Sequence, residues 1–324
     1  MISYPRVTVI CVVLAAHMMV ASAMGQDYPS RPVTIVVGYT PGATSDLLAR
    51  TMAERLSAVW GQSVIVDNKS GVGGNIAATY VARAPGDGYT LMVGTDAMMT
   101  SNVFLYKNTP FDPVKDFAPI TNAGANIICL AVHLELAVNS VAELIAYAKA
   151  NPGKLQYGSS GIGSPHHLAG ELLRQKTGID IVHVPYRGGG ATINDLLGGH
   201  IKLAFLSLSS AVPHLNSGNI RILAVVERDR YAAMSDIPTI GETVPGFEMS
   251  SWVGFFSPAP TPLPLLARLN DAMVNVLKID AVKEKLAALG LAVAPSTPSE
   301  LAAMVNQGLA VRGELVKAAN IQVE

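Results

Sequence analysis

The stretch VTIVVGYTPGATSDLLARTMAERLSAVW, residues 33–60, contains in order the signals of a strand, a tight loop and a helix. The β-branched run 33–38 predicts a buried strand, and the apolar spacing of 46–60 predicts a helix that ends at Gly61. Residues 39–45 between them form a short loop rich in Thr, Gly and Ser. A strand followed directly by a helix is the repeating unit of a wound α/β sheet.

The same pattern recurs along the chain and restarts near residue 155. A second loop, 159–165, also lies between a predicted strand and a predicted helix, and Pro165 suits that helix's first turn. We therefore expect two α/β lobes rather than one extended sheet. The further predicted strands are 63–66, 89–94, 127–132, 155–158, 181–184, 201–206 and 220–226, and the further predicted helices are 75–84, 141–150, 166–177, 191–197, 263–278, 281–289 and one from 299.

The composition is that of a packed globular protein. Half of the 324 residues are hydrophobic and 15% are charged. The 23 basic residues balance 24 acidic ones, so no electrostatic footprint supports binding to nucleic acid or to an anionic membrane surface.

The N-terminus has the three parts of a secretory signal peptide. Arg6 provides the positive region, residues 7–20 the apolar region and residues 21–23 the small residues before cleavage after Ala23 or Gly25. About 14 apolar residues are too few to span a membrane, so we expect residues 1–25 to be removed. The mature chain then keeps Cys129 alone, without an internal disulfide, and is expected in the periplasm without membrane insertion.

Catalytic, nucleotide-binding and metal-binding motifs are weak. The chain lacks the P-loop, CxxC and HExxH patterns, and its Gly-rich turn at 71–74 lacks the Rossmann spacing. Residues 158–161 fall one position short of a GxSxG elbow, which leaves a serine hydrolase using Ser160 with His166 or His167 as an alternative. His167 and Glu171 stand one helical turn apart, but two ligands make a poor metal site. We expect no cofactor and no metal.

The two strand-to-helix loops offer a different chemistry. Helix N-termini carry unpaired N–H groups and a positive partial charge, and hydroxyl groups beside them can donate to a carboxylate. Thr40, Thr44 and Ser45 lie on one loop, and Ser159, Ser160 and Ser164 on the other. Capping and turning are the ordinary roles of these residue types. Two such loops in two similar half-chains favour an anion held between lobes.

Several motifs make the chain resemble a known family nearly from end to end. They are YPSRPV at 28–33, GDGYTL at 86–91, FDPVKDF at 111–117, NPGKL at 151–155, HLAGEL at 167–172, HVPYRG at 183–188 and WVGFFSPA at 252–259. In these the chain resembles the Bug family, the extracytoplasmic solute-binding proteins of tripartite tricarboxylate transporters.

The resemblance implies a fold and a set of partners. The fold is the periplasmic binding protein type II architecture, with two α/β lobes joined by a two-crossing hinge that closes on a ligand. With crossings near Asn126 and Ser251, residues 26–125 and 251–324 form lobe 1 and residues 126–250 form lobe 2. The implied partners are a small carboxylate and the membrane permease of a tripartite tricarboxylate-type transporter, and we expect a monomer.

The family's Pro-Gly-Gly-x-x-Asp pattern falls on residues 41–46, with Ala43 in place of its second glycine. The 95–99 segment is expected to be a loop at the variable end of the pocket, where Asp96 either meets a ligand donor or caps a helix. Arg187 is a candidate for a second carboxylate, and Tyr39, Tyr186 and Phe205 are either an apolar wall or core aromatics. The complete candidate ligand-binding set is Tyr39, Thr40, Gly42, Ala43, Thr44, Ser45, Asp46, Thr95, Asp96, Ala97, Ser159, Ser160, Gly161, Gly163, Ser164, His166, Tyr186, Arg187 and Phe205.

The residues and the resemblance together predict a receptor that captures a mono- or dicarboxylate, aliphatic or aromatic, for delivery to a permease, and that performs no chemistry on it. The alternatives are the serine hydrolase and a subunit that binds the same acid and reports to a signalling partner.

Overall fold

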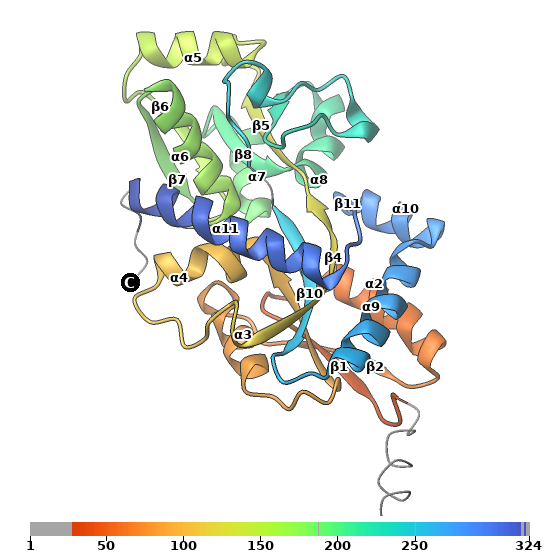
Figure 1. Ribbon diagram of the computed structural model, residues 1–324. Helices are drawn as coiled ribbons and strands as arrows, with labels where there is room; N and C mark the ends of the chain where they lie inside the picture. Colours follow the sequence, from red (N-terminus) through yellow and green to blue (C-terminus); the bar gives the residue numbers. More distant parts are fainter. Residues whose placement is uncertain (1–27, 187, 250, 319–320, 322–324) are drawn as a thin grey trace, which may run out of the picture.

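Two separate β-sheets organise the chain in the computed structural model, which describes residues 28–186, 188–249, 251–318 and 321 (Figure 1). The six-stranded sheet has the order β11 (Leu291–Val293), β4 (Phe117–Asn126), β10 (Trp252–Pro258), β3 (Thr90–Thr95), β1 (Val33–Val37) and β2 (Val64–Asn68). The five-stranded sheet has the order β7 (Ile181–Pro185), β6 (Leu155–Ser159), β8 (Leu203–Ser207), β5 (Ile128–His133) and β9 (Ile220–Val225). We call the parts built on these sheets lobe 1 and lobe 2. The expectation of a two-lobed α/β fold is confirmed.

The two sheets repeat one strand arrangement. In lobe 1, β1 lies between two parallel neighbours, β2 and β3, and β10 then runs antiparallel to β3 and β4. In lobe 2, β6 lies between the parallel strands β7 and β8, and β5 runs antiparallel to β8 and β9. β1 and β6 therefore hold equivalent places, and the loops that follow them leave equivalent edges of the two sheets.

Helices cover both sheets. In lobe 1, Leu48, Met52 and Leu56 are one turn apart on α2 and share a fully buried cluster with Ile35 of β1. In lobe 2, Leu168 of α6 packs with Tyr157 of β6 in the corresponding cluster. The helices are α2 (Thr44–Trp60), α3 (Asn75–Ala82), α4 (Asn102–Leu105), α5 (Val141–Ala150), α6 (Pro165–Thr177), α7 (Gly189–Leu197), α8 (Leu208–Ala211), α9 (Leu263–Leu277), α10 (Asp280–Ala288) and α11 (Pro298–Ala318).

The chain passes between the sheets where β4 ends at Asn126 and β5 begins at Ile128, and it returns into β10 at Trp252. The two passages lie side by side, because the backbone N–H of Asn126 donates to the carbonyl of Ser251 at 2.7 Å.

Helix α11 is an additional link between the lobes (Figure 1). Its Leu301 and Val305 are buried in a lobe 1 cluster, whereas its Leu315 and Val316 are buried in the main cluster of lobe 2. The sequence predicts residues 251–324, which include this helix, in lobe 1. The C-terminal turns of α11 also contact lobe 2.

Most predicted helices and strands are present within a few residues of their expected ends. The strands β4, β10 and β11 were not predicted as strands. The expected 95–99 loop is wrong: β3 continues to Thr95, and Ala97–Ser101 form a π-helical turn, labelled η3, that leads into α4.

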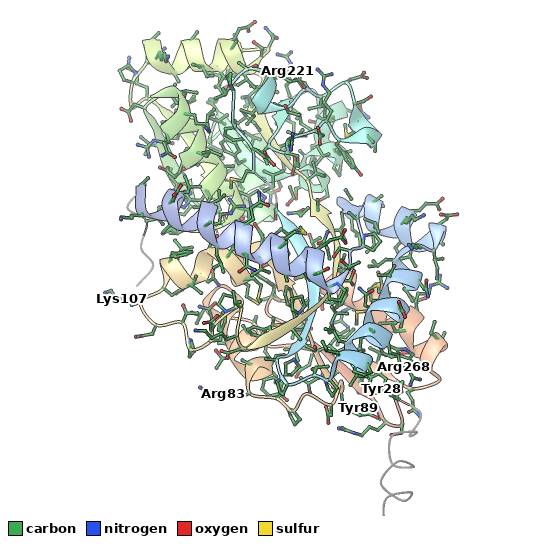
Figure 2. All side chains as sticks on the ribbon, in the orientation of Figure 1. Tyr28, Arg83, Tyr89, Lys107, Arg221 and Arg268 are labelled. Atoms are coloured by element: carbon green, nitrogen blue, oxygen red, sulfur yellow. The ribbon has the colours of Figure 1, made fainter. Side chains whose placement is uncertain are left out.

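Basic side chains are dispersed over the molecule. The labelled residues Arg83, Lys107, Arg221 and Arg268 lie in separate regions of Figure 2. Within the described part of the chain, no helix combines the length and apolar character needed to cross a membrane. The predicted signal peptide lies outside the described residues.

Candidate functional site

The lobe 1 loop leaves β1 and leads directly into α2. The residue before the helix, Ala43, has φ −66° and ψ 155° and offers no side-chain cap. The N–H groups of Asp46 and Leu47 donate to the carbonyl of Ala43. Since the first N–H groups of a helix have no intrahelical acceptor, those of Thr44 and Ser45 remain as donors. Ala43 needs no left-handed backbone here, so the departure from the family's glycine leaves the loop unstrained.

Asp46 fixes the shape of this loop. One carboxylate oxygen accepts from the Gly42 N–H at 2.9 Å and from Arg50 at 3.0 Å, and the other accepts from Asn68 at 2.9 Å. Asn68 also donates to the carbonyl of Tyr39. Burial alone would raise the pKa of Asp46, but these hydrogen bonds outweigh it and lower the pKa. The carboxylate is therefore ionised and turned toward its own loop.

The segment after β3 lies next to this loop. The hydroxyl groups of Tyr39 and Thr95 are 2.9 Å apart, and burial raises the pKa of Tyr39 to about 12. The neighbouring Asp96 and Ala97 are buried. Asp96 accepts hydrogen bonds from the side chains of Arg312 at 3.1 Å and Ser251 at 3.3 Å, so its side-chain partners come from α11 and the return passage.

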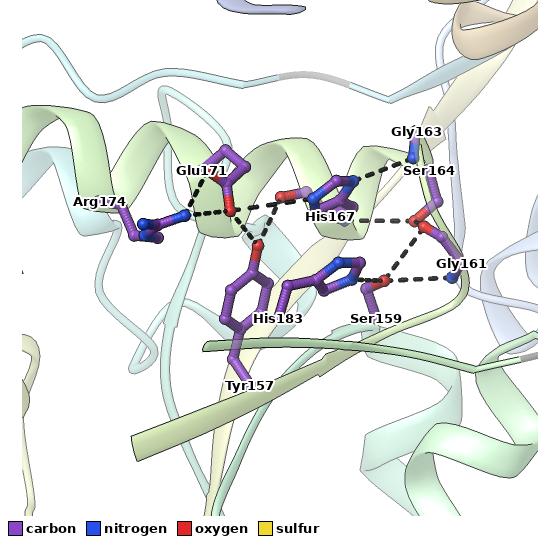
Figure 3. Close-up of polar contacts among 9 residues, drawn as sticks. All are labelled: Tyr157, Ser159, Gly161, Gly163, Ser164, His167, Glu171, Arg174 and His183. Carbon is purple, nitrogen blue, oxygen red and sulfur yellow. Dashed lines mark hydrogen bonds and ion pairs between the residues drawn. The ribbon is translucent and has the colours of Figure 1, made fainter. Parts of the chain in front are cut away.

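The lobe 2 loop leaves β6 and leads into α6. Ser164 caps the helix, because its hydroxyl oxygen accepts from the His167 N–H at 3.2 Å and its O–H donates to the carbonyl of Gly161 at 2.7 Å. The Gly163 N–H donates to Nδ1 of His167 at 3.0 Å. Ser159 is fully buried beneath the loop and lies 2.7 Å from Nε2 of His183 (Figure 3).

A layer of polar side chains supports the lobe 2 loop from below (Figure 3). The rings of His167 and His183 stack at 3.7 Å, and burial lowers the pKa of each to about 4. Glu171 accepts from Tyr157 at 2.7 Å and from Arg174 at 2.8 Å. His167 and Glu171 thus have structural partners, and no group of three or more His, Cys, Asp or Glu side chains in the described residues is arranged to hold a metal.

Ser160 contacts a second histidine. Its hydroxyl lies 2.6 Å from Nδ1 of His166, and Nε2 of the same ring lies 3.3 Å from the hydroxyl of Ser207. The His166 side chain is buried, which lowers its pKa to about 4. The imidazole is therefore neutral near pH 7, and its ring nitrogens contact two serine hydroxyls, those of Ser160 and Ser207.

The four remaining candidates lie in different settings. Thr40 is exposed, and its carbonyl accepts from the Ala43 N–H. Tyr186 is half-buried and donates to Asp195 at 2.7 Å. Phe205 is fully buried and packs edge-on against Tyr157 at 5.9 Å, so it is a core aromatic in this structure. Arg187 lies outside the described residues.

Segments of both lobes meet around these loops. A side chain at Gly163 would come within 2.4 Å of Leu105, so the lobe 1 segment after η3 touches the lobe 2 loop. The Asn126 side chain donates to Ser207 at 3.2 Å. In open α/β sheets, ligands bind beyond the carboxyl ends of the strands, which is where both loops leave β1 and β6.

A separate cavity of about 500 Å³ lies between α6, residues 246–249 and α11. Of the predicted site residues, only Asp96 lines it. Sequence reasoning missed its Arg312, although Arg312 falls on the same helical stripe as Leu301, Val305 and Leu315, a position where a charge signals a buried partner.

Comparison with known proteins agrees with this architecture. Residues 48–321 match the family model described as "Tripartite tricarboxylate transporter family receptor". BugT of Bordetella pertussis is 32% identical over 294 residues, covering 90% of each chain. Among solved structures, Rpa4515 of R. palustris with adipate is 39% identical, with a TM-score of 0.83 over 92% of this chain and 100% of that one.

Two other solved structures are similar. The periplasmic binding protein BugD is 32% identical with a TM-score of 0.78, covering 91% of this chain and 100% of that one. MatC from Rhodopseudomonas palustris with bound malate is 29% identical with a TM-score of 0.76, covering 89% and 100%. The matched family model describes a receptor and BugD is a periplasmic binding protein, so the chain is a solute-binding receptor rather than the alternative serine hydrolase. The chain belongs to the tripartite tricarboxylate transporter receptor family.

Proposed function

We propose that the protein is a periplasmic receptor that captures a small organic acid between its lobes and delivers it to a tripartite tricarboxylate-type permease. The observation that carries this proposal is the repeated strand arrangement, which gives each lobe a helix N-terminus at an equivalent sheet edge. The similar structures with adipate and with malate support a carboxylate ligand, because both molecules are small dicarboxylic acids.

One ligand carboxylate is held by both loops. The N–H groups of Thr44 and Ser45 and the Thr44 hydroxyl donate from lobe 1, where α2 has no side-chain cap to compete with the ligand. The His166 N–H lies in the first turn of α6 and donates from lobe 2, where Pro165 has no N–H and Ser164 already caps His167. Closure of the lobes removes water from these donors and strengthens each hydrogen bond.

Several candidate residues position the loops. Asp46, Ser159 and Ser164 each hydrogen-bond to a backbone group of their own loop. They keep the donors of Thr44, Ser45 and His166 in place. Substituting them is expected to weaken binding through loop geometry.

Calorimetric titration of the mature protein with aliphatic dicarboxylates and aromatic acids tests the proposal. We expect at least one acid to bind with a dissociation constant of about micromolar or below. This corresponds to a binding free energy of about −8 kcal/mol or stronger. Ser299→Ala, on the exposed start of α11, is a matched control that leaves this affinity unchanged. Failure of every acid to give heat or a thermal shift would refute the proposal.

Ligand binding alone does not distinguish delivery to a permease from sensing. The protein that the receptor contacts does. Crosslinking in membranes that contain a tripartite tricarboxylate-type permease is expected to capture the receptor in the presence of its acid. Recovery of a signalling kinase in place of the permease would assign the sensing role instead.

A further inference from the structure

The ring of His167 lies beneath the lobe 2 loop and accepts a hydrogen bond from it (Figure 3). The backbone N–H of Gly163 donates to Nδ1 of His167 at 3.0 Å. Burial lowers the pKa of His167 to about 4, so the ring is neutral near pH 7. Because a backbone N–H can only donate, Nδ1 is the acceptor and Nε2 carries the proton. The direction of this contact is therefore determined by the main chain.

The other side of the ring favours the same form of the imidazole. Nε2 of His167 lies 3.9 Å from a carboxylate oxygen of Glu171. Tyr157 and Arg174 donate to this carboxylate at 2.7 Å and 2.8 Å and hold it in place. An anion on this side attracts the Nε2–H group and leaves Nδ1 as the acceptor for the loop.

A second histidine supports the ring and the other end of the loop. The rings of His167 and His183 stack at 3.7 Å, with 8° between their planes. Nε2 of His183 lies 2.7 Å from the hydroxyl of Ser159, whose oxygen accepts from the Gly161 N–H at 3.1 Å. The stacked pair therefore reaches both glycines that flank the exposed Ile162.

Gly163 is the point of the loop where a displacement has the largest effect on the site. Its φ is 75°, and an added Cβ would lie 2.4 Å from Leu105, so lobe 1 touches the loop here. Helix α6 begins two residues later, and the N–H of His166 is the lobe 2 donor of the proposed ligand site. A shift of Gly163 changes the contact between the lobes and the position of this donor together.

We propose that His167 is a positioning residue of the ligand site, because its Nδ1 holds Gly163 where the lobe 2 donor and the contact with Leu105 are both aligned for the acid. This inference rests on the proposed function, since the acid is the one captured between the lobes. His167 does not touch the ligand and acts through the loop.

Two substitutions at position 167 separate the acceptor from the ring. His167→Leu keeps a similar volume but leaves the buried Gly163 N–H without its acceptor, so the acid is expected to bind about tenfold more weakly. His167→Asn places an amide oxygen near the position of Nδ1, and its affinity is expected to stay within about threefold of the parent's.

Leu173→Ala is the matched control for a general loss of stability. Leu173 lies on the same helix and is fully buried in the lobe 2 core, away from the loop contacts. The truncation leaves a cavity and lowers the unfolding temperature, whereas its affinity for the acid is expected to equal the parent's. Thermal unfolding of every variant accompanies the titrations.

Calorimetric titration with succinate, malate, adipate and benzoate separates this inference from the function on which it rests. Binding of none of these acids by the parent protein would overturn the proposed function. Binding by the parent with equal affinity in His167→Leu would overturn the positioning role alone. An affinity of His167→Asn as low as that of His167→Leu would overturn it as well.

NMR of the ¹⁵N-labelled parent protein tests the contact without a ligand and without any variant. A hydrogen bond between two nitrogens transmits a scalar coupling, and we expect one between the amide nitrogen of Gly163 and Nδ1 of His167. The amide proton of Gly163 is also expected to exchange slowly with solvent. A folded parent protein that lacks this coupling would overturn the inference.

Discussion

The guanidinium of Arg312 lies 3.1 Å from the carboxylate of Asp96, across 216 positions of the chain. Both side chains are almost fully buried, with 5% and 2% of their surfaces exposed. The pair joins helix α11 to the segment that follows β3. Because α11 also packs on lobe 2, this contact lies on a connection between the lobes.

Removing one partner of this ion pair is expected to destabilise the protein strongly. Arg312→Met keeps much of the side-chain volume but leaves the Asp96 carboxylate buried without its cation, which costs about 3–5 kcal/mol. The double variant Asp96→Asn with Arg312→Met is expected to regain most of this loss. Urea unfolding measures the free energy of unfolding of both variants. A loss of less than about 0.5 kcal/mol in Arg312→Met, the usual range for a surface substitution, would contradict a buried ion pair.

Asp46→Ala is expected to reduce both stability and affinity, since it leaves the Gly42 N–H and the Asn68 amide without their acceptor. The expected cost is about 1–3 kcal/mol, with a loss of affinity of about tenfold or more. Arg50→Ala is the matched control, because Arg50 is half exposed and a surface ion pair contributes about 0–1 kcal/mol. Equal effects of the two variants in calorimetry would show that Asp46 does not organise the loop.

Backbone conformation at residues 42 and 43 gives a matched pair of substitutions. Ala43 has φ −66°, so Ala43→Gly is expected to lower stability by about 0.4–1 kcal/mol through the entropy of the unfolded chain. Gly42 has φ 87° and no atom within 4 Å of an added Cβ, so Gly42→Ala costs about 1–2 kcal/mol from backbone strain alone. Thermal unfolding distinguishes the two, and a stabilising Gly42→Ala would refute the left-handed loop.

Acidification is expected to destabilise the protein before any carboxylate of ordinary pKa titrates. Burial lowers the pKa of His166, His167 and His183 to about 4, so the unfolded chain binds more protons than the folded one between pH 6.5 and about 4. Each such histidine lowers the free energy of unfolding by up to about 1.4 kcal/mol for each pH unit of acidification. Burial raises the pKa of Glu227 to about 7, so the folded chain binds an extra proton there over pH 4.5–7. This stabilises the folded protein as the pH falls and offsets the effect of about one histidine.

Urea unfolding at several pH values between 7.5 and 5 measures this slope. The expected loss is about 1–3 kcal/mol between pH 6.5 and 5. His167→Asn retains an acceptor for the Gly163 N–H but cannot be protonated, so its profile is expected to be flatter by about one proton. A profile as steep as the parent's would show that His167 is not one of the groups that titrate.

Local sequence patterns predicted the helices and the parallel strands well, because each such element has its own periodicity and stop signals. Helix α2 ends where Gly61 takes a left-handed backbone, as its residue type suggests. Strand β4 was missed because FAPITNAGAN mixes a proline with small and polar residues. It is held by β10, about 130 positions later, and no local pattern reveals such a partner.

The candidate site was predicted at the level of loops but not of individual contacts. The glycines, hydroxyls and helix starts of both loops could be read from the sequence. The sequence does not show whether a carboxylate faces a ligand or hydrogen-bonds within its own chain. The sequence did not decide between a ligand contact and a helix cap for Asp96, because its cationic partner, Arg312, lies 216 positions away. The contact between His166 and Ser207 was equally hidden, since Ser207 lies on a later strand, β8, and itself accepts from Asn126 of the other sheet.

A crystal structure of the mature protein with a bound acid tests the central claim most directly. The account predicts one carboxylate within hydrogen-bond distance of the N–H groups of Thr44 or Ser45 and of the His166 N–H, with both lobes in contact. An acid bound instead in the cavity beside Arg312, or held by one lobe alone, would contradict it.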